Sequence, residues 1–241
     1  MKKSMMVLAL VAVAFWQVAC NKVENQTKSL GGSSSTLSST PSLPVAAQPA
    51  KPVVAPLKSY DGPLGLAMGI PVDVLVKQLE FEEPTSESPN VYFGAPPKPA
   101  PGFNSYFVIA TARQGVCKVA AIANVDVVND SGDQLKSETD RIAEMVELKY
   151  GKPTKKYDVA LQDVYRRNSQ FFMMALREDA VVYAYSWANK SGGTALPNDL
   201  AEIEVRAAAS APKKAWVRLL YTFNNNAVCS AEIKKKKSAN L

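Results

Sequence analysis

The chain has 241 residues, a formal net charge of +6 and no histidine. Without histidine there is no Ser-His or Cys-His catalytic triad and no zinc site with a histidine ligand, which excludes the commonest ways of activating a nucleophile near neutral pH. Once Lys2 and Lys3 are set aside, 26 basic residues face 22 acidic ones, a net charge of +4. We expect no nucleic-acid partner from so small an excess.

The first residues are typical of an export signal. Lys2 and Lys3 form a short positive region, Met5 to Trp16 is an apolar run of twelve residues, and Val18-Ala19 places small residues before Cys20. A membrane-spanning helix needs about 20 apolar residues, so this run is too short to be one. The pattern predicts a signal peptide over residues 1–19.

The tripeptide Val18-Ala19-Cys20 resembles the lipobox of bacterial lipoproteins, although Gln17 stands where that family usually has an aliphatic residue. The resemblance implies that Cys20 is lipidated and becomes the new N-terminus, which anchors the chain to a membrane. Asn21 after the cysteine favours an outer membrane lipoprotein facing the periplasm. The alternative is an ordinary cleaved secretory signal that contains a chance cysteine.

Residues 20–58 are rich in Ser, Thr, Pro and Ala, with no helical or strand period. Such a segment has too little bulky apolar surface to offset the entropy of ordering. We therefore expect a disordered tether, followed by one domain over residues 59–241.

The domain pattern begins with a short helix over Pro71–Leu79. The acidic stretch Glu80–Asn90 and the Pro-rich loop Gly94–Gly102 then form a long connection of the kind that is often functional or disordered. Two strands, Ser105–Thr111 and Gly115–Ala123, form a predicted hairpin. Ser131 with Gln134 matches a capping box, and apolar residues at helical spacing then predict a helix that ends near Gly151.

Two more hairpins are predicted after that helix. One pairs Phe171–Leu176 with Val181–Trp187, and the other pairs Ala201–Ala209 with Ala215–Phe223. Asn224 to Asn226 are expected to cap a C-terminal helix that ends in the basic run Lys234–Lys237, for which a solvated helix end is the ordinary explanation.

This order of elements predicts an α+β fold: an antiparallel sheet of about six strands with helices packed on one face. The strand start Gly115-Val-Cys-Lys118, the helix end Lys149–Thr154 and the Lys-rich C-terminus together resemble an uncharacterised family of bacterial envelope proteins. That resemblance implies no activity.

With Cys20 committed to lipid, Cys117 and Cys229 remain. In an oxidising compartment an even pair favours a disulfide over a metal site, so we expect a bridge that fixes the last helix to the sheet. Two buried free thiols are the alternative.

Candidate catalytic groups are few. Carboxylates cluster at Glu80, Glu82 and Glu83 and at Asp130 and Asp133, and Ser210 and Lys213 have a Ser-x-x-Lys spacing inside a probable turn. Exposed loop carboxylates are common, and that serine motif needs a helix start. We therefore predict a protein that is not an enzyme and needs neither a cofactor nor a metal.

Aromatic residues give a different indication. Tyr183, Tyr185 and Trp187 alternate on one predicted strand, and Trp216 lies opposite the core face of its own strand. A stripe of this kind is usually covered by a helix. If it is bare, these four residues form a partner surface.

Three function classes follow. The first is a lipid-anchored envelope protein that binds another envelope or secreted protein, as an inhibitor, an immunity-type lipoprotein or an accessory of a secretion machine. The second is a structural lipoprotein that binds the cell wall, and the third is a carboxylate-dependent glycan hydrolase. The sequence indicates no oligomeric state.

Overall fold

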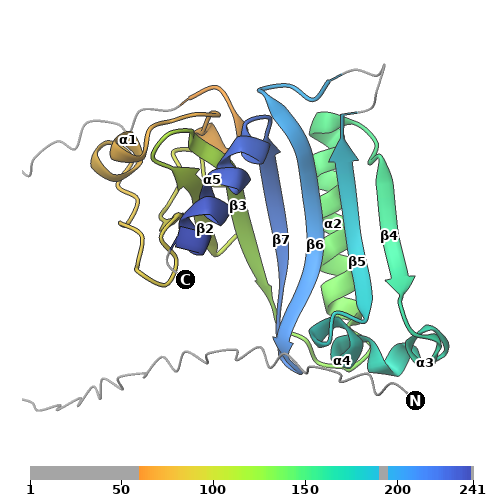
Figure 1. Cartoon of the computed structure of the whole chain (residues 1–241). Helices are drawn as coiled ribbons and strands as arrows, with labels where there is room; N and C mark the ends of the chain where they lie inside the picture. Colours follow the sequence, from red (N-terminus) through yellow and green to blue (C-terminus); the bar gives the residue numbers. More distant parts are fainter. Residues whose placement is uncertain (1–59, 190–194, 240–241) are drawn as a thin grey trace, which may run out of the picture. The chain divides into compact units, whose positions relative to one another are not determined.

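A computed structural model describes residues 60–189 and 195–239 of the chain. Within them, seven strands form one antiparallel sheet in the order β1-β2-β3-β7-β6-β5-β4 (Figure 1). The prediction of an α+β fold built on an antiparallel sheet is confirmed. The predicted signal peptide, lipidation site and tether (1–58) lie outside the described residues.

The elements have the following bounds. The strands are β1 (Val91–Phe93), β2 (Ser105–Thr111), β3 (Gly115–Val125), β4 (Lys155–Ala160), β5 (Val181–Ala188), β6 (Leu200–Ala211) and β7 (Lys214–Phe223). The helices are η1 (Pro63–Gly65), α1 (Val72–Lys77), α2 (Asp133–Tyr150), α3 (Asp163–Arg167), η2 (Ser169–Phe171), α4 (Phe172–Arg177) and α5 (Asn226–Ala239).

Helix α2 covers one face of the sheet, across β5, β6 and β7. It buries a stripe at helical spacing that includes Leu135, Thr139, Ile142 and Val146. The strands alternate in the same way, so that Ile203, Val205 and Ala207 of β6 are buried between half-buried polar neighbours. Both periods follow from backbone geometry, which is why this long helix and the β6–β7 hairpin were predictable from the sequence.

One predicted hairpin is wrong. The run Phe171–Leu176 is not a strand, because Phe172–Arg177 forms helix α4, with Phe172, Met173, Ala175 and Leu176 buried. Strand β5 instead pairs with β4, a short strand that the sequence pattern did not indicate. An apolar run of this length cannot be assigned by periodicity alone, and its Met, Ala and Leu residues are good helix formers.

The predicted capping box is also wrong, although the helix is present. Gly132 stands at the N-cap with φ +65°, and the Ser131 hydroxyl donates to the Asp133 carboxylate, 2.8 Å away. A Cβ at Gly132 would lie 2.5 Å from the Phe172 ring. The close approach of α4 therefore requires glycine here and displaces the cap expected from Ser131.

A β-bulge sets the direction of Cys117. Val108 pairs with Val119, and Ala110 pairs with Val116, so Val116 and Val119 lie on the same face although they are three residues apart. Simple alternation along β3 would place Cys117 on the face of Val119. The extra residue in β3 instead lets the Cys117 side chain reach the opposite face.

Helix α5 lies on that opposite face. In Figure 1 it crosses in front of β3, whereas α2 lies behind β5 and β6. The Thr111 hydroxyl of β2 donates to the Glu232 carboxylate of α5 at 2.8 Å, and Thr111 is on the side of the sheet away from Val108 and Ala110. The sheet is thus covered on both faces, by α2 on one and by α5 over β2 and β3 on the other.

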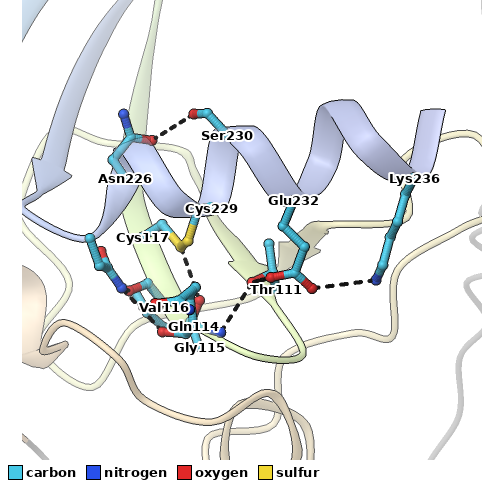
Figure 2. The surroundings of a disulfide bond; sticks show 11 residues. Thr111, Gln114, Gly115, Val116, Cys117, Asn226, Cys229, Ser230, Glu232 and Lys236 are labelled. Atoms are coloured by element: carbon cyan, nitrogen blue, oxygen red, sulfur yellow. Dashed lines mark hydrogen bonds and ion pairs between the residues drawn. A yellow bond between two sulfur atoms is a disulfide. The ribbon is translucent and has the colours of Figure 1, made fainter. Parts of the chain in front are cut away.

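The predicted disulfide between Cys117 and Cys229 is confirmed (Figure 2). Both cysteines are buried, and the Asn225 amide donates to the carbonyls of Gln114 and Val116, which ties the start of α5 to the β2–β3 turn. The far side of α5 is exposed, and Lys234–Lys236 are solvated as expected. One covalent bond and a few polar contacts therefore hold this helix.

Replacing both cysteines by serine should lower the free energy of unfolding. The bridge joins residues 112 positions apart, and a crosslink over a loop of that length stabilises a protein by about 2–4 kcal/mol in typical measurements. Urea unfolding of the double variant, beside the parent chain under oxidising and reducing conditions, measures the difference. An unchanged midpoint would contradict a stabilising role for the bridge.

Candidate functional site

The aromatic stripe on β5 is covered and does not form the partner surface considered from the sequence. Tyr183 and Trp187 are 5% and 2% exposed beneath α2, and the Trp187 indole donates to the Gly151 carbonyl at 2.7 Å. Trp216 is half-buried and pairs with Ala208 on the face away from α2. Tyr183, Tyr185 and Trp187 thus share the face that α2 covers, whereas Trp216 lies on the other face, so the four residues form no common surface.

The stripe has a structural role instead. The hydroxyls of Tyr183 and Tyr185 both donate to one Asp140 carboxylate oxygen of α2, at 2.7 and 2.6 Å. The Lys156 ammonium of β4 lies 4.9 Å from the Tyr185 ring centroid. Burial and then the Asp140 carboxylate raise the pKa of both tyrosines, and a hydrogen bond with Tyr185 raises the pKa of Lys156. The network fastens α2 to β5 and β4.

The candidate carboxylates lie in exposed positions. Glu80, Glu82 and Glu83 are exposed, as are Asp130 and Asp133. Hydrogen bonds from Ser131 and Asn129 lower the pKa of Asp133. A general acid in glycoside hydrolysis needs a raised pKa, so the environment of Asp133 does not favour that role.

The Ser-x-x-Lys motif does not have the structural context that a serine enzyme needs. Ser210 is in β6 and Lys213 is in the turn to β7, so this serine does not open a helix. Among residues 60–189 and 195–239, no group of three or more Cys, Asp or Glu side chains is arranged to hold a metal ion. The helices of that same part include none that is long and apolar enough to cross a membrane.

A cleft of about 480 Å³ lies between α2, β7, η1 and the Pro-rich loop. We call it the tyrosine–lysine cleft. Its floor is apolar and comes from α2 and β7, and its rim carries charged and hydroxyl groups. The residues that define it are Asp61, Leu64, Lys98, Phe103, Ile142, Met145, Val146, Lys149, Tyr150, Asn198, Leu219 and Tyr221.

Three chain segments that are distant in sequence form its walls. The Pro-rich loop supplies Lys98, whose amide donates to the Leu64 carbonyl of η1 at 3.0 Å. The same loop is fixed to β2, because the Tyr106 hydroxyl donates to the Ala100 carbonyl at 2.8 Å. Helix α2 forms the third wall. The Pro-rich loop is therefore an ordered part of the site.

Two tyrosines, Tyr150 and Tyr221, form one side of the cleft and bring their hydroxyl groups to it. The rings of Tyr150 and Tyr221 pack with centroids 6.2 Å apart, and the Lys149 ammonium lies 5.1 Å from the Tyr150 centroid. Burial raises the pKa of Tyr221, helped by its hydrogen bond with Tyr150. The Tyr221 phenol is thus protonated at neutral pH.

The charged rim of the cleft is basic. Lys98 and Lys149 are exposed and, within the part of the chain that the structure describes, form no ion pair. Asp61 is the acidic residue of the lining. An apolar floor with a few polar groups at the edge is the usual form of a binding site. This one suits an apolar side chain that has an anionic group beside it.

Backbone strain marks the same place. Leu64 has φ +57°, in the left-handed region that bulky side chains rarely adopt. Such a conformation costs about 1–3 kcal/mol and tends to occur at functional sites. In this conformation the Leu64 carbonyl accepts the hydrogen bond from the Lys98 amide, which joins η1 to the Pro-rich loop in the cleft wall.

Sequence reasoning did not identify the residues of the cleft. Of the segments that the sequence pattern singled out, the Gly94–Gly102 loop contributes to the cleft through Lys98 and Ala100. Lys149 and Tyr150 fall at the end of a predicted helix and Tyr221 falls within a predicted strand, and neither pattern marks a binding site. Their meeting depends on strand order, which the sequence pattern does not contain.

Comparisons of the chain with protein-family models, with curated proteins and with solved structures found no match. The resemblance of the domain to an envelope family stays a prediction.

Replacing Asp140 by alanine should destabilise the fold, because two tyrosine hydroxyls lose their acceptor. We expect the free energy of unfolding to fall by about 2–3 kcal/mol, the typical cost of removing hydrogen bonds to a charged group. Glu144→Ala, one turn further along α2 at an exposed position, is the matched control and should change stability by less than about 0.5 kcal/mol. Equal effects in urea unfolding would contradict the network.

Proposed function

We propose that this chain is a lipid-anchored protein of the bacterial cell envelope that binds another envelope or secreted protein through the tyrosine–lysine cleft. The observation that carries the proposal is the cleft itself: an ordered hollow with an apolar floor, two tyrosine hydroxyls and two exposed lysines. Tyrosine is enriched at the energetic centres of protein interfaces. The partner would present an apolar side chain next to a carboxylate.

The anchor part of the proposal depends on the N-terminal sequence. Lys2 and Lys3, the apolar run and Val18-Ala19-Cys20 support lipidation, and Asn21 supports an outer-membrane position facing the periplasm. Acyl chains on Cys20 would hold the protein to the membrane, since each buried methylene contributes about 0.8 kcal/mol. The disulfide accords with an oxidising compartment.

A binding function accords with the chemistry of the cleft better than a hydrolytic one. The titratable groups of its lining are Asp61, Lys98, Lys149, Tyr150 and Tyr221. Glycoside hydrolysis uses a pair of carboxyl groups that flank the bond to be broken, and the lining contributes one. We therefore propose inhibition, immunity or assembly of a partner protein in preference to catalysis.

Replacing Cys20 by alanine should release the protein from membranes. Fractionation of cells expressing the parent chain and the variant, with intact mass measured after reduction and alkylation, checks both the location and the added lipid. The parent chain should carry the mass of acyl groups and lose the residues before Cys20. A parent chain that is recovered soluble and without lipid would overturn the anchor and leave the cleft proposal standing.

A photoreactive amino acid at Met145, on the cleft floor, should crosslink to the partner in intact cells. The control is the same probe at Leu148, which lies on α2 but is 90% exposed. We expect one adduct of defined mass with the Met145 probe and none with the Leu148 probe. An adduct with cell-wall glycan in place of protein would favour the structural alternative.

Reversal of charge at the rim tests whether the partner is anionic there. The double change Lys98→Glu and Lys149→Glu should abolish the Met145 adduct, because the two cations that face the partner become repulsive. Lys213→Glu with Lys214→Glu changes the net charge equally at the β6–β7 turn and should leave the adduct intact. Loss of the adduct in both double variants would show that net charge, and not the cleft, controls binding.

A further inference from the structure

The outer edge of β4 has backbone groups free to pair with another strand. Just beyond the strand ends, the Leu161 amide donates to the Ala180 carbonyl that precedes β5, and the Asn189 amide that follows β5 donates to the Ala201 carbonyl of β6 on the other side. Antiparallel hydrogen bonds recur at every second residue, so Tyr157 and Val159 bond inward to β5. The backbone N–H and C=O groups of Lys156, Asp158 and Ala160 therefore point away from the sheet.

The opposite edge of the sheet differs. Strand β1 has three residues, and the amide of Glu82 donates to the Phe93 carbonyl at 2.7 Å, so the preceding segment already uses that edge. Strand β4 has six residues without proline, and no hydrogen bond to its outer backbone is found among residues 60–189 and 195–239. An open edge of this length favours pairing with a further strand.

The charges of β4 restrict which strand can pair. Lysines on an edge usually prevent pairing, and β4 begins with Lys155 and Lys156. Asp158, however, follows two residues later on the same face as Lys156 and has the same outward backbone direction. A strand that places a carboxylate opposite Lys156 and a cation opposite Asp158 would form two favourable cross-strand charge pairs.

A second copy of β4 meets this requirement in one antiparallel register. Hydrogen-bonded pairs must join outward-pointing residues, and only a two-fold axis at Lys156, Tyr157 or Asp158 also gives Lys156 a partner inside β4. An axis at Lys156 sets lysine against lysine, and an axis at Asp158 sets aspartate against aspartate. An axis at Tyr157 sets each Lys156 opposite Asp158 of the second copy.

We propose that the chain forms a two-fold symmetric dimer through β4, which joins two seven-stranded sheets into one. Lys156 and Asp158 of each copy exchange backbone hydrogen bonds and opposite charges with Asp158 and Lys156 of the second copy. Tyr157 lies against its own equivalent on the face away from α2. Val159 and Leu161, which are 44% and 65% exposed, gain cover from the second copy.

The two faces of the paired β4 strands carry different contacts. On the α2 face the Lys156 ammonium already lies over the Tyr183 and Tyr185 rings, so its position is fixed before association. On the other face the Lys155 ammonium lies 4.3 Å from the Tyr157 centroid. In a two-fold dimer the β4 edge of each copy pairs with the β4 edge of the other. No β4 edge is then left for a third copy to bind.

The dimer is independent of the proposed function. Its residues belong to β4, whereas the tyrosine–lysine cleft is lined by η1, the Pro-rich loop, α2, Asn198 and β7. Loss of dimers would therefore leave cleft binding unaffected, and failure of cleft binding would leave the dimer.

Cysteine crosslinking in the full chain tests the register. Directly opposed residues of a non-hydrogen-bonded pair have Cα atoms about 4.5 Å apart, within disulfide range. Tyr157→Cys should give a disulfide-linked dimer under mild oxidation. Val159→Cys is the matched control: its equivalent in the second copy is four residues away along the strand, about 13 Å. Crosslinking of Val159→Cys in place of Tyr157→Cys would overturn the register.

Charge exchange tests the pairing in solution. Asp158→Lys sets like charges opposite each other twice and should weaken the dimer about tenfold or more in sedimentation experiments. The double change Asp158→Lys with Lys156→Asp restores the opposition and should restore the dimer, and circular dichroism checks that each variant is folded. A parent chain that stays monomeric at high concentration, or a double variant no better than the single one, would overturn the proposal.

Discussion

The packing of α2 on one face of the sheet is the constraint on which the other features depend. Its buried stripe covers β5, β6 and β7, and this fixes where its two flanks lie. On one flank Met145, Lys149 and Tyr150 line the tyrosine–lysine cleft. On the other flank, Asp140 accepts hydrogen bonds from the hydroxyls of Tyr183 and Tyr185. These bonds fix the position of α2 on β5, the strand next to β4. The same helix explains why the aromatic stripe is a structural feature and not a partner surface.

Helix α5 lies on the face opposite α2, over β2 and β3. Its contact with the sheet is small, and Val228 on its outer side is 54% exposed. A helix with so little buried area gains little from the hydrophobic effect. The bulge at Cys117 resolves this, since it turns a residue of a core strand toward α5 and permits a covalent link. The disulfide thus compensates for a modest interface at the chain's C-terminal helix.

The sequence pattern was reliable where a single period governs a long element. Helix α2 and the β6–β7 hairpin were predictable because each buries one regular stripe against a large surface. Helix α4 was not, because a six-residue apolar run fits a buried helix and a strand equally well. Strand β4 was missed because it is an exposed edge whose residues have no apolar alternation. The cleft was missed for a further reason: its residues converge only through strand order, and the interaction of Lys98 with Leu64 has no local sequence signal.

The cleft and the β4 edge lie on different elements of one domain, and this arrangement has a consequence for an anchored protein. If the proposed lipid anchor and the proposed dimer both hold, the dimer presents two identical clefts, each on its own tether. Linking two binding sites makes the second binding event intramolecular, and the gain in avidity is about 10²–10⁴ where both sites can engage together. A modest cleft of about 480 Å³ could then hold an oligomeric or repetitive partner firmly. Each cleft could then bind its partner weakly while the dimer binds tightly. The effective concentration of the second cleft depends on the tether length and on the geometry of the dimer.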